Sequence, residues 1–171
     1  DSLIGSLIRN IFSHRVEANQ HTIAALFAAD RLDHILNPVN GLLKQIRDGK
    51  IVICDRYFYS SYAYHGVHVD MNWVIDMNKS AAEFLKPDHT FYIDVPPEVS
   101  MQRIISNRSN VELYETLSNL QQVYDKYGEA FELLRGSYPV TIIDGQQEIH
   151  IIQDIINNKI FSSIKSGALP K

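Results

Sequence analysis

Hydrophobic residues recur along most of the chain at the three- and four-residue spacing of an α-helix. The first such stretch runs from Leu3 to Phe12 and follows Asp1-Ser2, a suitable N-cap pair. Further stretches predict helices over residues 17–36, 39–46, 70–85, 97–106, 116–134 and 148–164. Pro38 separates the second helix from the third, and Asp48-Gly49 follows the third. The pattern therefore predicts a largely helical chain.

Three short apolar runs follow no helical period and predict strands over residues 51–54, 90–93 and 140–143. Each run is followed by a carboxylate, at Asp55, Asp94 or Asp144. The run at 51–54 is apolar throughout, which is typical of a strand buried on both faces of a parallel sheet. Strands that alternate with helices predict an α/β fold with a parallel sheet. Such sheets usually have nearer five or six strands, so the chain begins as though part of its sheet were absent.

Composition narrows the class of protein. With 171 residues, 45% of them hydrophobic, the chain suits a single domain over residues 1–165, followed by a tail at 166–171. The net charge of −4 argues against a nucleic-acid polymer as partner. Cys54 is the single cysteine, which favours a cytoplasmic location and suggests a small buried apolar side chain. No apolar run approaches the length of a membrane span, so no membrane partner is expected.

The candidate chemistry lies directly after the run at 51–54, where Asp55 and Arg56 stand side by side. Ligands of open α/β sheets bind at the carboxyl ends of the strands. A carboxylate there suits a hydrated metal ion, and a guanidinium suits a phosphate held by two parallel hydrogen bonds. A salt-bridged pair that caps the strand is the alternative. The residues that follow are rich in hydroxyl groups and aromatic rings, which favours the ligand site.

The sequence Asp55-Arg56-Tyr57, followed by Ser60-Ser61 and Ala63-Tyr64-His65-Gly66, resembles the central signature of thymidylate kinases. Other stretches resemble further signatures of the same family in the same order, at residues 26–31, 86–99, 108–115 and 143–145. The resemblance therefore covers nearly the whole chain. In its short form, the chain is most similar to the archaeal members of the family.

The resemblance implies transfer of the γ-phosphoryl group of ATP to the 5′-phosphate of dTMP, with Mg²⁺, by a cytoplasmic homodimer. It also implies a P-loop, nucleoside monophosphate kinase-like fold, a parallel sheet flanked by helices. The sequence contains no G-x-x-x-x-G-K-[ST] phosphate cradle. We therefore expect the natural protein to have an N-terminal extension that supplies the cradle and the central strand. Without that strand, the run at 51–54 would have an unpaired edge.

For the nucleoside, the resemblance implies that Phe27 stacks on thymine and that Arg31 donates a hydrogen bond to its O4. These two residues are four apart and share one helix face, although a core phenylalanine beside a surface arginine has the same spacing. Ser61 would lie near thymine N3. Tyr64 would close on the deoxyribose C2′, leaving no partner for a 2′-hydroxyl. His65 replaces the family's frequent glutamine, and no role is assigned to it.

For catalysis, the resemblance implies that Arg56 binds the acceptor phosphate and that Asp55 organises the water shell of Mg²⁺. Arg9 would lie near the substrate phosphate, although a solvated helix face explains it equally well. The polar segment 107–115 would form a short lid, with Arg108 binding ATP and Tyr114 contacting the nucleotide, although a plain helix N-terminus explains Tyr114 equally well. The complete set of expected substrate-binding residues is Phe27, Arg31, Arg56, Ser60, Ser61, Tyr64, Tyr114 and Arg9.

Two alternative functions are left open by the sequence. A deoxynucleoside kinase shares an acidic–arginine strand end but phosphorylates a 5′-hydroxyl, which requires a general base near the acceptor. A catalytically inactive nucleotide-binding or dimerising protein follows if the phosphate cradle is truly missing.

Overall fold

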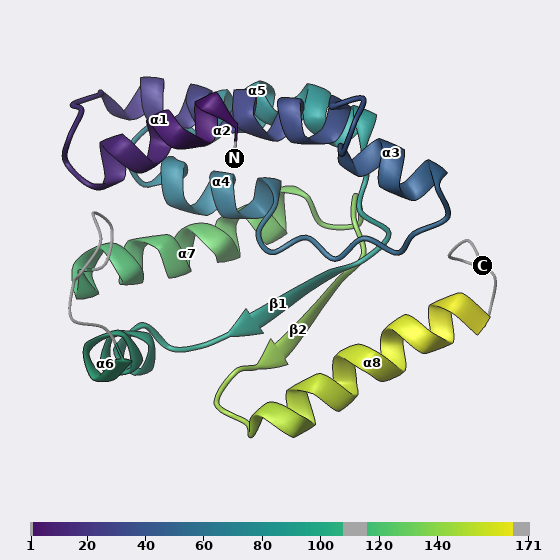
Figure 1. The fold of residues 1–171 in the computed structure, drawn as a ribbon. Helices are drawn as coiled ribbons and strands as arrows, with labels where there is room; N and C mark the ends of the chain where they lie inside the picture. Colours follow the sequence, from purple (N-terminus) through teal and green to yellow (C-terminus); the bar gives the residue numbers. More distant parts are fainter. Residues whose placement is uncertain (1, 108–115, 166–171) are drawn as a thin grey trace.

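The computed structural model describes residues 2–107 and 116–165, and all but one of the helices in these residues lie close to the positions that the sequence predicts (Figure 1). The helices are α1 (Leu3–Phe12), α2 (Gln20–Leu36), α3 (Leu42–Arg47), α4 (Phe58–Gly66), α5 (Met71–Phe84), α6 (Pro97–Asn107), α7 (Leu117–Leu133) and α8 (Ile149–Lys165). The strands are β1 (Thr90–Asp94) and β2 (Val140–Asp144). Among the described residues, no helix is both long and apolar enough to cross a membrane.

Side-chain caps explain where several helices begin. In α1, α2, α5 and α7 the N-cap side chain accepts a hydrogen bond from the backbone N–H three residues further on. The capping residues are Ser2, Asn19, Asp70 and Thr116. A cap of this kind satisfies one of the N–H groups that a helix start leaves without an intrahelical partner. Ser2 and Asp70 were expected as caps from the sequence, whereas α2 begins three residues later than predicted, after its cap Asn19.

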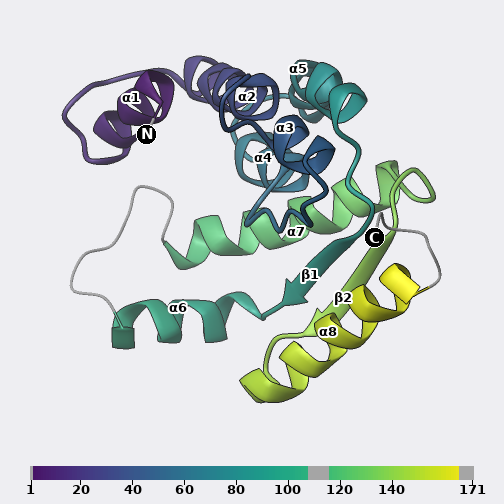
Figure 2. The ribbon, with the colours of Figure 1, turned by 45° about the vertical axis from the view of Figure 1, so that its right-hand side comes forward.

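The two strands pair in parallel, with Thr90 opposite Val140 and Asp94 opposite Asp144. Helices α6 and α7 form the crossover between them. Figures 1 and 2 both show α8 beside the sheet, on the side away from α1–α5. Helix α7 packs between the sheet and α4, because the ring of Phe131 lies 5.0 Å from Tyr92 of β1 and 5.0 Å from Tyr59 of α4. This packing connects the sheet to the helical part of the protein.

Helix α4 is not among the predicted helices, although its apolar residues have helical spacing. Phe58, Tyr59, Tyr62 and Ala63 are all buried, and the three aromatic residues form part of the face that packs against α5 and α7. Aromatic residues have modest helix propensity, so tertiary packing rather than intrinsic preference stabilises this helix. The opposite face of α4 is thereby held toward α2.

Residues 51–54 do not form the predicted buried strand. They have no regular secondary structure, and Ile51 and Ile53 are 52% and 82% exposed. A strand is stabilised by hydrogen bonds to a neighbouring strand, and β1 and β2 pair only with each other within the described sheet. The prediction that Cys54 is buried is also wrong, because Cys54 is exposed, with its thiol 3.3 Å from the Arg56 carbonyl oxygen.

Candidate active site

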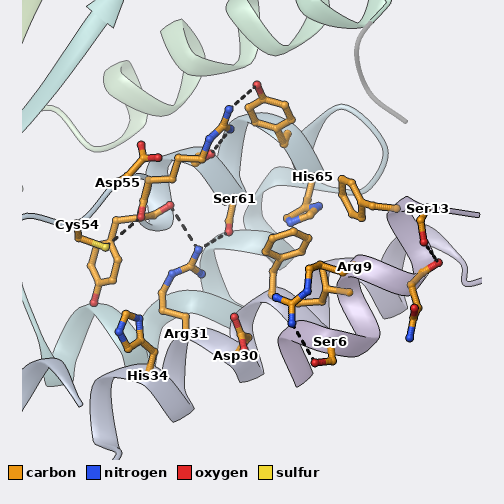
Figure 3. Close-up of a pocket in the computed structure, with 18 of the residues that line it drawn as sticks. Ser6, Arg9, Ser13, Asp30, Arg31, His34, Cys54, Asp55, Ser61 and His65 are labelled. Atoms are coloured by element: carbon orange, nitrogen blue, oxygen red, sulfur yellow. Dashed lines mark hydrogen bonds between the residues drawn. The ribbon is translucent and has the colours of Figure 1, made fainter. Parts of the chain in front are cut away.

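A pocket with a volume of about 1470 Å³ opens between α1, α2, α4 and the segment that precedes α4 (Figure 3). Every site residue that the sequence predicts within the described part of the chain lines this pocket. These residues are Arg9, Phe27, Arg31, Asp55, Arg56, Ser60, Ser61 and Tyr64. The predicted lid, with Arg108 and Tyr114, and the tail at 166–171 lie outside the described residues, apart from the end of α6.

Helix α2 supplies Phe27 and Arg31 from one face, as their four-residue spacing predicts. The ring of Phe27 is held by aromatic neighbours from two other helices. Its centroid lies 5.8 Å from Phe12 of α1, edge to face, and 5.0 Å from the imidazole of His65 of α4. The interpretation of Phe27 as an ordinary core residue is therefore incomplete, because its ring also lines an open cavity.

The guanidinium of Arg31 is held by acceptors from two other parts of the chain. Its Nη2 donates to Ser61 Oγ at 2.8 Å and, at 3.4 Å, to the carbonyl oxygen of Tyr57, while Nη1 donates to Asn78 Oδ1. Burial lowers the pKa of Arg31. A guanidinium has five N–H donors, so the bonds described here leave two for a ligand. Figure 3 shows Arg31 reaching toward Ser61 across the pocket wall.

Arg56 has a backbone φ of 63°, in the left-handed region that residues other than glycine rarely adopt. Its Nη1 donates to Ser60 Oγ at 3.1 Å and its Nη2 lies 3.4 Å from the Tyr64 hydroxyl. The guanidinium carbon lies 4.8 Å from the centre of the Tyr64 ring. Sparsely populated backbone conformations of this kind are typical of functional sites.

Asp55 is exposed at the same edge of the pocket. Among the residues that the structure describes, no ion pair joins Asp55 to Arg56, which contradicts the alternative of a salt-bridged strand cap. The described residues also contain no group of three or more His, Cys, Asp or Glu side chains that could hold a metal ion. An exposed carboxylate does fit a Mg²⁺ ion that keeps its own water molecules.

The remaining predicted residue, Arg9, lies on α1, at the side of the pocket away from Asp55 in the view of Figure 3. Its Nη2 donates to Ser6 Oγ at 2.9 Å. Arg9 thus lines the pocket while remaining exposed, so the structure is compatible with both interpretations of this residue.

The sequence assigned no part in the site to His65, which lines the pocket, or to Asn78 and Tyr127, which contact the lining residues Arg31 and Tyr64. His65 is 3% exposed, and its Nδ1 has no hydrogen-bond partner among the described residues. Burial, helped by the charges of Arg31 and His68, lowers the pKa of His65 to about 4, so its ring is neutral at physiological pH. Tyr127 of α7 lies edge to face with Tyr64, at 6.5 Å between ring centres. A polar residue on a buried helix face was the available signal for Asn78.

The family model and the similar proteins that comparison finds all name the same family. The family model described as thymidylate kinase matches residues 1–156. The chain is similar to the "Probable thymidylate kinase" of Methanocaldococcus jannaschii, with 36% identity over 155 residues that cover 88% of this chain and 74% of the relative. It is 37% identical over 150 residues to the "Thymidylate kinase" of Ligilactobacillus salivarius, covering 83% of this chain and 70% of that protein. The "Thymidylate kinase" of Acholeplasma laidlawii is 31% identical over 173 residues, which cover 95% of this chain and 81% of that protein.

Proposed function

Because the chain belongs to the thymidylate kinase family, we propose that it transfers the γ-phosphoryl group of ATP to the 5′-phosphate of dTMP, giving dTDP and ADP. One observation carries the assignment of the site. The pair suited to a pyrimidine base, Phe27 and Arg31, and the pair suited to a phosphate and its metal ion, Asp55 and Arg56, line the same pocket.

The base end of the pocket suits thymine. Phe27 offers an aromatic face for stacking, and the remaining N–H donors of Arg31 suit the O4 carbonyl oxygen. Ser61 lies beside Arg31 and adds a hydroxyl group to the same polar edge. Cytosine has an amino group in place of O4, so its N–H would meet the N–H donors of Arg31 and leave both without an acceptor. A loss of this kind is costly in a desolvated site.

The sugar and phosphate would lie toward α4 and the segment before it. Tyr64 is suited to close on the deoxyribose C2′, where its ring gives a 2′-hydroxyl no acceptor. Arg56, already hydrogen-bonded to Ser60, can bind the 5′-phosphate and hold it in line with the transferred group. Its positive charge also offsets the repulsion between the two anionic substrates.

The family also uses ATP as co-substrate, generally with Mg²⁺. In this chain Asp55 would hold the ion through its water shell, and the ion would neutralise charge on the phosphate oxygens. The proposal for Arg108 as an ATP-binding residue and for Tyr114 as a nucleotide contact rests on the family signature alone. A homodimer and a cytoplasmic location are proposed on the same basis, and sedimentation of the full-length protein tests the first of them.

A coupled assay of the full-length protein with ATP tests the proposed function, with dTMP, dUMP, dCMP and thymidine offered as acceptors. We expect dTMP to be the preferred acceptor and dCMP to be poor. Phosphorylation of thymidine in preference to dTMP would show a deoxynucleoside kinase. Binding of dTMP without turnover of any acceptor would show an inactive nucleotide-binding protein.

A further inference from the structure

Asn78 occupies a position where a polar side chain is costly. It lies on the buried face of α5 and is 1% exposed, with Val74 and Ala81 of the same face exposed by 0% and 1%. Burying an amide without hydrogen bonds is destabilising, whereas an apolar residue would fit such a face without this cost. The hydrogen bonds that the Asn78 amide makes therefore show what a polar side chain contributes at this buried position.

Both ends of the Asn78 amide are hydrogen-bonded. The Nδ2 group donates to the carbonyl oxygen of Val74 at 2.8 Å, and Oδ1 accepts from Nη1 of Arg31. These two bonds determine each other, because a flipped amide would place its NH₂ group against the guanidinium and its oxygen against a carbonyl. The α5 backbone thereby fixes an acceptor that points at Arg31, which lies 47 residues away in the sequence.

Asn78 acts together with two acceptors on the other side of the guanidinium. Ser61 Oγ and the Tyr57 carbonyl oxygen accept from Nη2, while Asn78 accepts from Nη1. Acceptors on both terminal nitrogens fix the plane of the guanidinium as well as its position. A free arginine side chain has about 2 kcal/mol of rotamer entropy, and a side chain ordered in advance does not lose it when a ligand binds.

We propose that Asn78 is a positioning residue for base recognition, which holds Arg31 in the orientation that reads the O4 carbonyl oxygen of the pyrimidine. The inference rests on the proposed function, because it assigns Arg31 to the base. A purely structural Asn78 would tie α5 to α2 and contribute to stability alone. A positioning Asn78 affects the nucleotide acceptor and leaves ATP unaffected.

The test compares four variants of the full-length protein. Asn78→Leu removes the acceptor at similar volume, and Asn78→Ser, which is too short to reach Arg31, is made alongside so that a variant unable to fold does not leave the question open. Asn78→Asp keeps an oxygen facing Arg31 but loses the bond to the Val74 carbonyl. Val74→Ala is the matched control, a buried substitution one turn away whose side chain makes no hydrogen bond. For each variant, the KM values for dTMP and ATP, the preference for dTMP over dCMP, and the unfolding midpoint are measured.

We expect Asn78→Leu and Asn78→Ser to raise the KM for dTMP about tenfold and to lower the preference for dTMP over dCMP by a similar factor, with the KM for ATP unchanged. Asn78→Asp should stay within about threefold of the wild type in both quantities, even if its unfolding midpoint falls. Val74→Ala should lower the midpoint and leave both quantities unchanged.

The inference is overturned if the Leu and Ser variants keep the wild-type KM and dTMP preference, or if Val74→Ala changes them as much. It is also overturned if Asn78→Asp loses the preference to the same extent as Asn78→Leu. A wild-type protein that phosphorylates dTMP, combined with any of these results, removes only the role of Asn78. A wild-type protein that does not phosphorylate dTMP removes the proposed function, and the inference with it.

Discussion

Substitution of Arg56 separates the contribution of its side chain to turnover from the contribution of its backbone to stability. Its guanidinium lies at the pocket edge with Ser60 and Tyr64, and its backbone has the left-handed φ of 63°. Two variants address the two parts. Arg56→Ala removes the guanidinium and keeps a Cβ in the strained conformation, whereas Arg56→Gly removes both the guanidinium and the strain.

The expected loss of turnover follows from the bonds that the guanidinium can make to a phosphate. A hydrogen bond to a charged group contributes about 1.5–3 kcal/mol, so two parallel bonds contribute about 3–6 kcal/mol. If these bonds are strongest in the transition state, kcat/KM falls by about 10²–10⁴ in both variants. Arg56→Lys keeps the positive charge but cannot donate two parallel hydrogen bonds, so its kcat/KM should lie between those of these variants and the wild type.

The stability of the two variants should differ in an unusual direction. In an ordinary position, glycine is less stabilising than alanine by about 0.5–1 kcal/mol. At a left-handed residue, alanine has a steric cost of about 1–2 kcal/mol that glycine does not have. We therefore expect Arg56→Gly to be at least as stable as Arg56→Ala, and both to lie within about 1 kcal/mol of the wild type, because the lost side chain is exposed.

The coupled kinase assay gives kcat/KM, and urea unfolding gives the free energy of unfolding of each variant. Near-normal turnover in Arg56→Ala would remove Arg56 from the mechanism. A glycine variant that is less stable than the alanine variant by a full 1 kcal/mol would show that the left-handed conformation is not a property of the folded protein.

Three further predictions concern the sugar subsite, a buried imidazole and the end of the sheet. Tyr64→Ala should lower the preference for dTMP over its ribonucleotide counterpart by about tenfold, which competition between the two nucleotides measures. His65 has its pKa lowered to about 4, so between its ordinary value of 6.5 and pH 4 the unfolded chain binds the extra proton, and stability falls as the pH falls. His65→Gln should reduce this fall by on the order of 3 kcal/mol in urea unfolding at pH 7 and pH 4, and an unchanged fall would contradict the burial of its imidazole. Gly145→Ala should destabilise the protein by about 1–3 kcal/mol, because the added Cβ would lie 2.7 Å from Ile93 Cγ2 and 3.0 Å from the Asp94 carbonyl oxygen. A thermal midpoint equal to that of the wild type would refute this close packing.

The sequence predicts the helices well where local signals are sufficient. Asp70 is a recognisable cap, and the helices predicted to start at residues 70 and 116 each begin within one residue of that position. The run at 51–54 has a typical strand composition, yet a strand requires a partner, and local sequence does not show which partner is present. Helix α4 was missed for the opposite reason, because packing against α5 and α7 stabilises a segment whose aromatic and hydroxyl residues are modest helix formers.

In the candidate site, too, the sequence predicts some features, and only the structure shows the others. Phe27 and Arg31 were predicted to share a helix face, and the structure places both at the pocket. Their supporting contacts are long-range, such as the bond between Arg31 and Asn78, so spacing along the chain does not reveal them. The positive φ of Arg56 likewise depends on how the chain enters α4, and an arginine at that position does not indicate a left-handed backbone. The motifs thus predict side chains that line the pocket, and the fold shows which other side chains hold them in place.

A crystal structure of the full-length protein with bound dTMP tests the central claim most directly, namely that one pocket reads the base at Arg31 and holds the phosphate at Arg56. We predict a thymine ring stacked on Phe27, with O4 about 3 Å from an Arg31 nitrogen and the 5′-phosphate at the same distance from the Arg56 guanidinium. A nucleotide bound outside this pocket, or bound with its phosphate at Arg31 and its base at Arg56, would contradict the account.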